Sequence, residues 1–268
     1  MTQEAEHRKA QTTAGFNRLA PVYDAAGVGC FAHFGQKLID SIGVEPGQTV
    51  LDVATGRGAV LFPAAERVGP TGQVTGVDLA EAMVEATRAE AERRKLAVDV
   101  RVMDAEHLTF SNKRFDRVLC GFGLMFFPNL DQALSDMQRV LKPNGRLGVS
   151  TWQISQADDL RAVLDDLGLG GPGEPGWITA PDALARLLID AGFKNVEVQV
   201  ATNTFHYADL TQYWQNARGT GLSRRLAALD TEQTDRARAV LAERLRPYQR
   251  SDGLYVDASA LLGLGSAT

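Results

Sequence analysis

The feature that most constrains the fold is an alternation of short apolar runs with segments of helical spacing. The apolar runs are typical of buried parallel strands and lie at residues 49–53, 73–77, 98–103, 115–120 and 146–151. Segments whose apolar residues recur at helical spacing lie between them, at residues 60–68, 80–95 and 129–141. Such an alternation predicts a parallel sheet covered by helices on both faces.

The remaining parts of the chain are less regular. Residues 1–14 are polar and indicate a loose tail, and 31–42 have helical spacing. Gly168–Gly176, with five glycines and two prolines, indicates a loop. Further segments predict a helix at 181–191, strands at 196–205 and 254–264, and helices within 209–250.

We therefore predict a doubly wound α/β fold with a mostly parallel, seven-stranded, Rossmann-like sheet and a helical lid. The lid has an N-terminal part, residues 1–44, and an inserted cap, residues 209–251. The core of the predicted fold comprises residues 45–208 and 252–268.

Composition excludes several classes of function. The chain has 28 Lys and Arg against 33 Asp and Glu, a net charge of −5, and has no dense basic stripe, so nucleic acid is a poor partner. Cys30 and Cys120 are far apart and outside metal-type spacing, so we expect no metal site. The two cysteines allow one disulfide, but we favour a reducing compartment. The polar N-terminus and the lack of a run of about 18 apolar residues predict a cytoplasmic protein without membrane insertion.

The most informative segment is Val50–Gly58, where a strand enters a glycine-containing turn that opens a helix. In doubly wound folds a ligand binds at this place. A dinucleotide fingerprint requires a third glycine, and Leu61 occupies that position. The carboxylate of Asp52 would repel a pyrophosphate but suits a cationic ligand such as S-adenosylmethionine. An NAD(P)-dependent oxidoreductase remains the alternative.

Two further acids follow the next predicted strands. Asp78 lies 20 residues past Gly58, where a carboxylate can accept both ribose hydroxyls. Asp104 can accept from the adenine amino group, and the Ala105 backbone amide can donate to the ring. Each acid also has a structural interpretation: Asp52 as a helix-dipole partner, Asp78 as an N-cap and Asp104 as a turn acid.

With these residues in place, the chain resembles the class I S-adenosylmethionine-dependent methyltransferases over residues 15–152. Within that class it is similar to the small-molecule branch of the ubiquinone/menaquinone-biosynthesis type. The matching stretches are FNRLAPVYD (16–24), VLDVATGRG (50–58), VTGVDLAEAMV (74–84), VMDAEHLTF (102–110), FDRVLCGFGLMFFPN (115–129) and LKPNGRLGVSTW (141–152). Thr55 and Arg57 depart from the commonest loop, which has more glycine.

The resemblance implies S-adenosylmethionine as cofactor, S-adenosylhomocysteine as product and a definite set of contacts. The turn and the end of the fourth strand would hold the methionine part, and Tyr23 would lie over the cofactor. The predicted cofactor-binding residues are Tyr23, Asp52, Ala54, Thr55, Gly56, Gly58, Asp78, Leu79, Met83, Asp104, Ala105, Glu106, Gly121 and Phe122.

The acceptor is less constrained. Large apolar residues after the fourth strand indicate either plain core or an apolar acceptor pocket, because the carboxyl ends of strands face the ligand crevice. The predicted pocket residues are Phe16, Phe31, Met125, Phe126, Trp152, Tyr213 and Trp214. His33, among aromatic residues of the N-terminal lid, is the candidate general base, although a histidine in such a place is more often structural.

We therefore predict methyl transfer by in-line displacement to a small hydrophobic acceptor, at oxygen or carbon, by a monomer or homodimer. The stretch CGFGLMFFPN lacks the Asn/Asp-Pro-Pro-aromatic motif of nucleic-acid amino-methyltransferases. A catalytically silent protein that only binds the cofactor is a further alternative.

Overall fold

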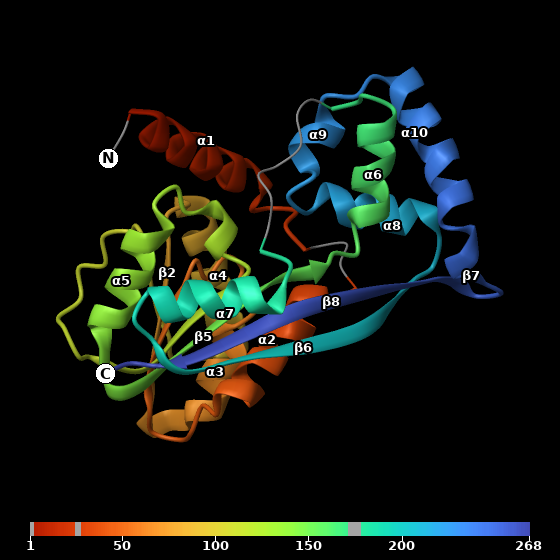
Figure 1. Cartoon of the computed structure of the whole chain (residues 1–268). Helices are drawn as coiled ribbons and strands as arrows, with labels where there is room; N and C mark the ends of the chain where they lie inside the picture. Colours follow the sequence, from red (N-terminus) through yellow and green to blue (C-terminus); the bar gives the residue numbers. More distant parts are fainter. Residues whose placement is uncertain (1–2, 25–27, 171–177) are drawn as a thin grey trace.

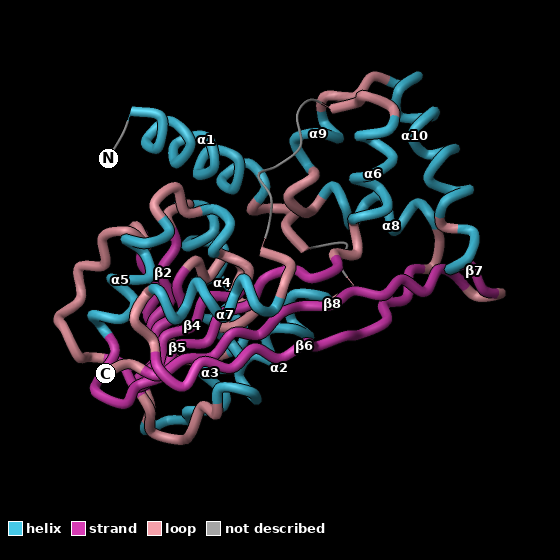
Figure 2. Tube along the Cα trace, in the orientation of Figure 1, coloured by secondary structure: helices cyan, strands magenta, loops and turns pink. Residues whose placement is uncertain are grey.

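A single twisted sheet forms the centre of the molecule (Figures 1 and 2). The computed structural model describes residues 3–24, 28–170 and 178–268. The strands are β1 (Thr49–Val53), β2 (Gln73–Asp78), β3 (Asp99–Val102), β4 (Phe115–Gly121), β5 (Leu141–Ile154), β6 (Lys194–Tyr207), β7 (Gln249–Arg250) and β8 (Gly253–Ser266).

The strand order, β3-β2-β1-β4-β5-β8-β6, confirms the predicted mostly parallel sheet. Strands β1 to β5 pair in parallel, whereas β8 is antiparallel to both β5 and β6. The two-residue β7, which pairs with β8, brings the sheet to eight strands instead of the predicted seven. The order reverses between β1 and β4, and a crevice at the carboxyl ends of the strands is expected there.

Helices cover both faces of the sheet. The helices are α1 (Gln3–Leu19), α2 (Cys30–Ile42), α3 (Leu61–Val68), α4 (Glu81–Arg94), α5 (Leu130–Val140), α6 (Asp158–Asp166), α7 (Pro181–Asp190), α8 (Leu210–Arg218), α9 (Ser223–Ala227) and α10 (Thr231–Arg244). Short 3-10 helices are η1 (Gly69–Thr71), η2 (Leu124–Phe126) and η3 (Arg246–Tyr248). One core cluster contains Phe34 of α2 and Leu61 of α3, and another contains Met137 of α5 and Leu188 of α7. The apolar stripes predicted for these helices therefore pack on opposite faces of the sheet.

The helices α6, α8, α9 and α10 gather beyond one end of the sheet, at the upper right of Figure 1. Helices α8 to α10 lie between β6 and β8 in the chain, as expected for the inserted segment. Helix α6, which the sequence did not predict, comes from the β5 side and contacts α10. The predicted loop Gly168–Gly176 falls largely outside the described residues, at 171–176.

The prediction of a loose N-terminal tail is wrong, because residues 3–19 form the regular helix α1. Its sequence is rich in good helix formers but has almost no apolar stripe, and only Leu19 is buried. Helix α1 contacts α4 across the carboxyl edge of the sheet. Tertiary contacts rather than amphipathicity therefore hold it.

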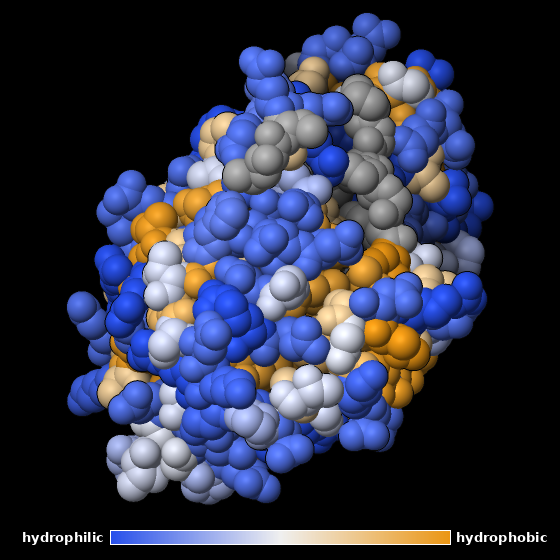
Figure 3. All heavy atoms as spheres, turned by 60° about the vertical axis from the view of Figure 1, so that its left-hand side comes forward, coloured by the Kyte–Doolittle hydropathy of each residue, from blue (hydrophilic) through white to orange (hydrophobic). Residues whose placement is uncertain are grey.

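The surface turned forward in Figure 3 is mostly hydrophilic, with apolar atoms in small separate groups. Among the described residues, no helix combines the length and the apolar character that crossing a bilayer requires. Both cysteines are buried free thiols.

Candidate cofactor and acceptor site

A first cavity lies at the carboxyl edge of strands β1 to β4, under α1. Eleven of the predicted cofactor-binding residues line it: Tyr23, Ala54, Gly56, Asp78, Leu79, Met83, Asp104, Ala105, Glu106, Gly121 and Phe122. They come from the ends of four successive strands and from the N-terminal segment, so segments far apart in sequence meet at one edge of the sheet.

Asp78 fixes the glycine turn after β1. One carboxylate oxygen accepts from the Gly56 backbone N–H and the other from the Ala80 N–H, both at 2.9 Å. Burial raises the pKa of Asp78, whereas these backbone hydrogen bonds oppose the rise. Gly56 has a φ of +50°, and nothing lies within 4 Å of where a Cβ would stand. The turn therefore offers a side-chain-free backbone beside a carboxylate, which fits the ribose and methionine parts of the predicted cofactor.

Two non-glycine residues of the cavity wall have left-handed backbones, Ala54 with a φ of 56° and Phe122 with 54°. This conformation is costly for L-residues and concentrates at ligand sites. Both residues directly follow a strand, β1 and β4. The strain therefore marks the two places where the chain turns sharply to form the cavity.

The far edge of the cavity is acidic, and a lysine that the sequence analysis missed reaches it. Lys9 on α1 forms ion pairs with Asp104 and Glu106, each at 2.7 Å. Lys9, Thr12, Thr13 and Phe16 all line the cavity. Their spacing of i, i+3, i+4 and i+7 places these four residues on one face of α1. Had residues 3–19 been predicted as a helix, this spacing would have identified the face that lines the cavity.

A second cavity adjoins the first, and six of its thirteen lining residues are aromatic. It is lined by Phe16, Tyr23, Phe31, Phe122, Met125, Phe126, Trp152, Ser155, Gln156, Ala157, Arg161, Thr220 and Gly221. Phe122 and Trp152 lie 4.2 Å apart between ring centroids, and Tyr23 stacks on Phe31 at 5.4 Å. Four residues, Phe16, Tyr23, Phe122 and Phe126, line both cavities. Two ligands in the two cavities would therefore be neighbours.

Comparisons with known proteins agree with this geometry. Residues 50–145 match the family described as "Methyltransferase domain". The chain is 33% identical over 214 residues to the ubiquinone/menaquinone biosynthesis C-methyltransferase UbiE of Cupriavidus necator, covering 72% of this chain and 88% of that protein. The chain belongs to the class I S-adenosylmethionine-dependent methyltransferases.

Other relatives define how far this similarity reaches. Nocamycin O-methyltransferase of Saccharothrix syringae is 47% identical over 136 residues, but the match spans only about half of each protein, 50% of this chain and 49% of that one. The crystal structure of the [4+2]-cyclase SpnF superposes with a TM-score of 0.57 at 20% identity, covering 88% of this chain and 82% of that chain. The last likeness concerns the fold alone, and fold alone does not determine a reaction.

Three residues predicted to bind the methyltransferase cofactor do not line the first cavity: Asp52, Thr55 and Gly58. Asp52 is 1% exposed and accepts a 2.7 Å hydrogen bond from the Thr55 hydroxyl behind the turn. Burial raises its pKa to about 7, so near neutral pH its carboxyl is only partly charged. A direct contact between Asp52 and a cationic ligand is therefore not supported.

At Gly58, a Cβ would lie 2.5 Å from the Phe62 ring, so this glycine serves packing.

Two predicted acceptor residues, Tyr213 and Trp214, are buried in the cap and do not line the second cavity. The Tyr213 hydroxyl donates a 2.5 Å hydrogen bond to the Gln156 backbone carbonyl, and the Tyr207 hydroxyl donates to the Gln156 side chain. Gln156 itself lines the cavity. Tyr213 therefore supports the wall from behind, because α8 turns its aromatic face toward the interior of the cap.

The candidate base His33 lines neither cavity. It is on α2, and its ring contacts Phe34 and Phe205 at centroid distances of 5.3 and 5.8 Å. Its Nε2 is buried with no hydrogen-bond partner among the described residues. Burial and the charge of Lys37 lower the pKa of His33. These contacts favour the structural interpretation and give no route to a ligand.

Proposed function

We propose that this protein transfers the methyl group of S-adenosylmethionine to oxygen or carbon of a small hydrophobic acceptor by in-line displacement. The observation that carries the proposal is the wall shared by the two cavities: one is edged by acids and glycine backbone, the other is aromatic. Such a pair brings a cofactor and an apolar acceptor into contact, and alignment supplies much of the catalysis in a reaction of this kind.

The residues present fit the cofactor. Asp78 would accept from the ribose hydroxyls, because its two oxygens offer about four lone-pair positions and the backbone N–H groups do not use all of them. Asp104 and the Ala105 backbone would hold the adenine, with Leu79 and Met83 against its apolar faces. The open backbone at Gly56 leaves space for the methionine part. When bound, the cofactor supplies an activated methyl group on a positively charged sulfur.

The chain's own part in the chemistry is to align the acceptor and to exclude water. Phe31, Met125 and Trp152, which line only the second cavity, would hold the flat apolar part of the acceptor. The shared rings Tyr23 and Phe122 would bring it toward the methyl group and keep the site dry. The described residues that line the two cavities include no histidine, so we assign no general base.

We further propose that the N-terminal segment 1–44 and the cap insertion 209–251 close over the site as a lid. The shared residues Phe16 and Tyr23 support the first part, and Thr220 and Gly221 in the second cavity support the other. Helix α6 belongs with this cap, because Arg244 of α10 pairs with Asp159 of α6. A cytoplasmic location and a monomeric or homodimeric state remain expectations.

Calorimetric titration with S-adenosylmethionine, S-adenosylhomocysteine and NADH tests the cofactor. We expect binding of the first two ligands and none of NADH; tight NADH binding alone would favour the oxidoreductase alternative. Incubation of a metabolite extract with deuterated methyl donor, followed by mass spectrometry, tests the reaction. We expect one apolar compound to gain the label, whereas cofactor binding without S-adenosylhomocysteine production would favour a silent binding protein.

A further inference from the structure

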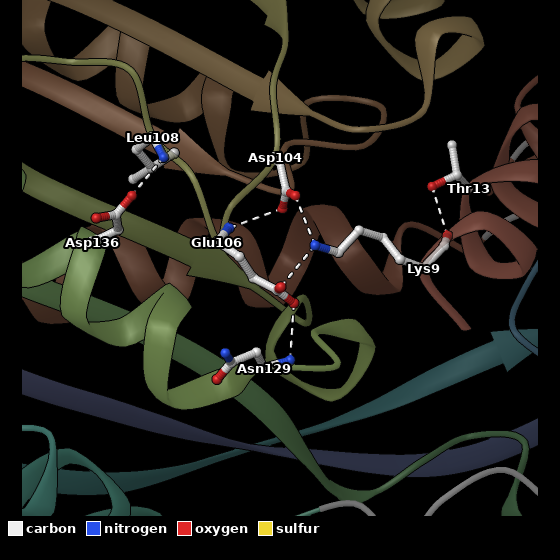
Figure 4. A network of polar contacts seen from close by, with 7 residues as sticks. All are labelled: Lys9, Thr13, Asp104, Glu106, Leu108, Asn129 and Asp136. Carbon is white, nitrogen blue, oxygen red and sulfur yellow. Dashed lines mark hydrogen bonds and ion pairs between the residues drawn. The ribbon is translucent and has the colours of Figure 1, made fainter. Parts of the chain in front are cut away.

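A single lysine ties the N-terminal half of α1 to the acidic edge of the first cavity (Figure 4). The Lys9 ammonium lies 2.7 Å from an oxygen of Asp104 and 2.7 Å from an oxygen of Glu106. The Lys9 side chain is 11% exposed and that of Glu106 only 1%. Burial lowers the pKa of Lys9, but its hydrogen bonds to the two acids outweigh burial and raise it. The ammonium therefore stays charged in a mostly enclosed position, where ion pairs are screened little by solvent.

The two acids are themselves anchored to the core. The Glu106 backbone N–H donates to Asp104 at 2.9 Å, and the second oxygen of Glu106 accepts from the Asn129 N–H at 2.9 Å. The Asn129 side chain in turn accepts from the Gln132 N–H and caps α5. Lys9 thus joins α1 to a rigid network that includes the β3–β4 connection and the start of α5 (Figure 4).

Further contacts anchor the C-terminal end of α1. The ring of Phe16 meets that of Phe126 edge to face at 4.9 Å, and the side chain of Asn17 accepts from the Ala82 N–H at 3.0 Å. Leu19 is the only residue of α1 that is buried. The described residues of the N-terminal half include no buried apolar side chain, and the ion pairs of Lys9 tie this half to the acidic edge across the cavity.

We propose that Lys9 is a positioning residue that holds α1 closed over the adenosine end of the site and so sets how long cofactor and product stay bound. The proposal rests on the proposed function, in which Asp104 accepts from the adenine amino group. Lys9 and the adenine would then share one carboxylate, with the lysine on the solvent side. A bound nucleoside can leave only after α1 lifts, and lifting α1 breaks both ion pairs.

Three variants test this role: Lys9→Met, Lys9→Arg and the matched control Arg8→Met. Arg8 is the neighbouring cation on the same helix and is exposed, outside both cavities. Stopped-flow measures the dissociation rates of S-adenosylmethionine and S-adenosylhomocysteine. Steady-state kinetics with the labelled acceptor then shows whether each variant changes the KM for S-adenosylmethionine, kcat or both.

For Lys9→Met we expect dissociation of both ligands to be about tenfold or more faster, with a raised cofactor KM and no matching fall in kcat. Lys9→Arg should recover most of the slow dissociation, because a guanidinium can reach both carboxylates. Arg8→Met should stay within about twofold of the wild type. Equal dissociation rates in Lys9→Met and Arg8→Met would overturn the proposal.

A second measurement uses the wild-type protein alone. Hydrogen exchange with and without S-adenosylhomocysteine should show slower exchange of residues 3–13 when the product is bound. Unchanged exchange there, while the product is bound, would also overturn the role of Lys9. If the wild type binds no S-adenosyl ligand, the proposed function itself fails, so the two failures are distinguishable.

Discussion

The two cavities, which we propose as the adenosine end and the acceptor end of the site, are built in different ways. The adenosine end is formed at the carboxyl ends of β1, β2, β3 and β4 with α1 above them, and its acids are fixed by backbone hydrogen bonds such as Gly56 to Asp78. The acceptor end is assembled from η2, the end of β5, α6 and the connection between α8 and α9. The part of the first cavity at the sheet edge is therefore specified by short local segments, whereas its α1 wall and the whole second cavity depend on long-range packing.

The two ends also differ in the chemical groups that they present to a ligand. Carboxylates and backbone amides are directional, so the adenosine end selects a ligand by its hydrogen-bonding groups. Aromatic rings such as Phe31, Phe122 and Trp152 select by shape and apolar area. Substitutions at one end should consequently leave the other nearly unchanged, and the following experiments examine that independence.

The largest effect is expected for Asp78→Ala. It removes the carboxylate that holds the turn and is proposed to accept the ribose, so binding of S-adenosylmethionine should weaken by roughly 1.5–3 kcal/mol. Calorimetry measures the affinity, and the acceptor KM at saturating cofactor should stay the same. Asp99→Ala, an exposed acid at the start of β3, is the control. An unchanged affinity in Asp78→Ala would show that the ribose assignment is wrong.

The second prediction concerns the buried carboxyl of Asp52, whose folded-state pKa is raised to about 7. Because the folded protein holds this proton more tightly than the unfolded chain, the contribution of Asp52 to stability is lost as pH rises from about 4 through 7. The free energy of unfolding should therefore fall with rising pH in the wild type, and Asp52→Asn should reduce this slope by up to about 1.4 kcal/mol per pH unit.

Urea unfolding at pH 5, 6, 7 and 8 measures the slope, with Asp131→Asn on the exposed side of α5 as control. Burial also raises the pKa of Asp24, to about 6. Asp24 therefore makes the free energy of unfolding fall with pH in the same direction, and both variants keep this contribution. Parallel stability curves for wild type and Asp52→Asn would contradict the raised pKa of Asp52.

Two methionines allow a crossed test of the two ends. Met125 lines only the second cavity and Met103 only the first. Met125→Ala should raise the acceptor KM roughly fivefold, about 1 kcal/mol, and leave the cofactor Kd within twofold. Met103→Ala should do the reverse. If either variant changes both constants alike, the two ends are coupled and the comparison fails.

The smallest effect is expected for His33→Gln. A general base contributes roughly 10²–10⁴-fold to a rate, whereas a side chain outside both cavities should change kcat by less than about twofold. The measurement is kcat with the labelled acceptor between pH 6 and 9. A hundredfold loss with unchanged melting temperature would restore His33 as the base.

The sequence predicted the sheet, and it predicted which residues meet in the first cavity at the sheet edge, because local patterns determine both. A buried strand, a glycine turn and an acid at the next strand end place Asp78 beside Gly56 whatever the rest of the chain does. The confirmed fold class follows from the same alternation. Asp52 shows the limit of this logic, because a strand end does not fix on which side of the turn a carboxylate lies.

The acceptor end was predicted less accurately because helix orientation in a cap depends on tertiary contacts. Phe31, Met125 and Trp152 line the second cavity as predicted, but Tyr213 faces the cap interior. Lys9 was missed for a related reason: its helix has little apolar periodicity, and the acids that it meets are about a hundred residues away in sequence.

The inserted cap leaves and rejoins the sheet at one pair of antiparallel partners, Tyr207 on β6 and Leu254 on β8. The inserted segment of about 45 residues therefore begins and ends at neighbouring positions of the sheet. Changing the length of such a segment alters the entropic cost of closing it only slightly. An exchanged insertion would still have to pack against α6, which comes from the β5 side and pairs with α10. Among the described residues, the insertion contributes Thr220 and Gly221 to the second cavity and no residue to the first, so we expect changes in it to alter the acceptor more than the cofactor.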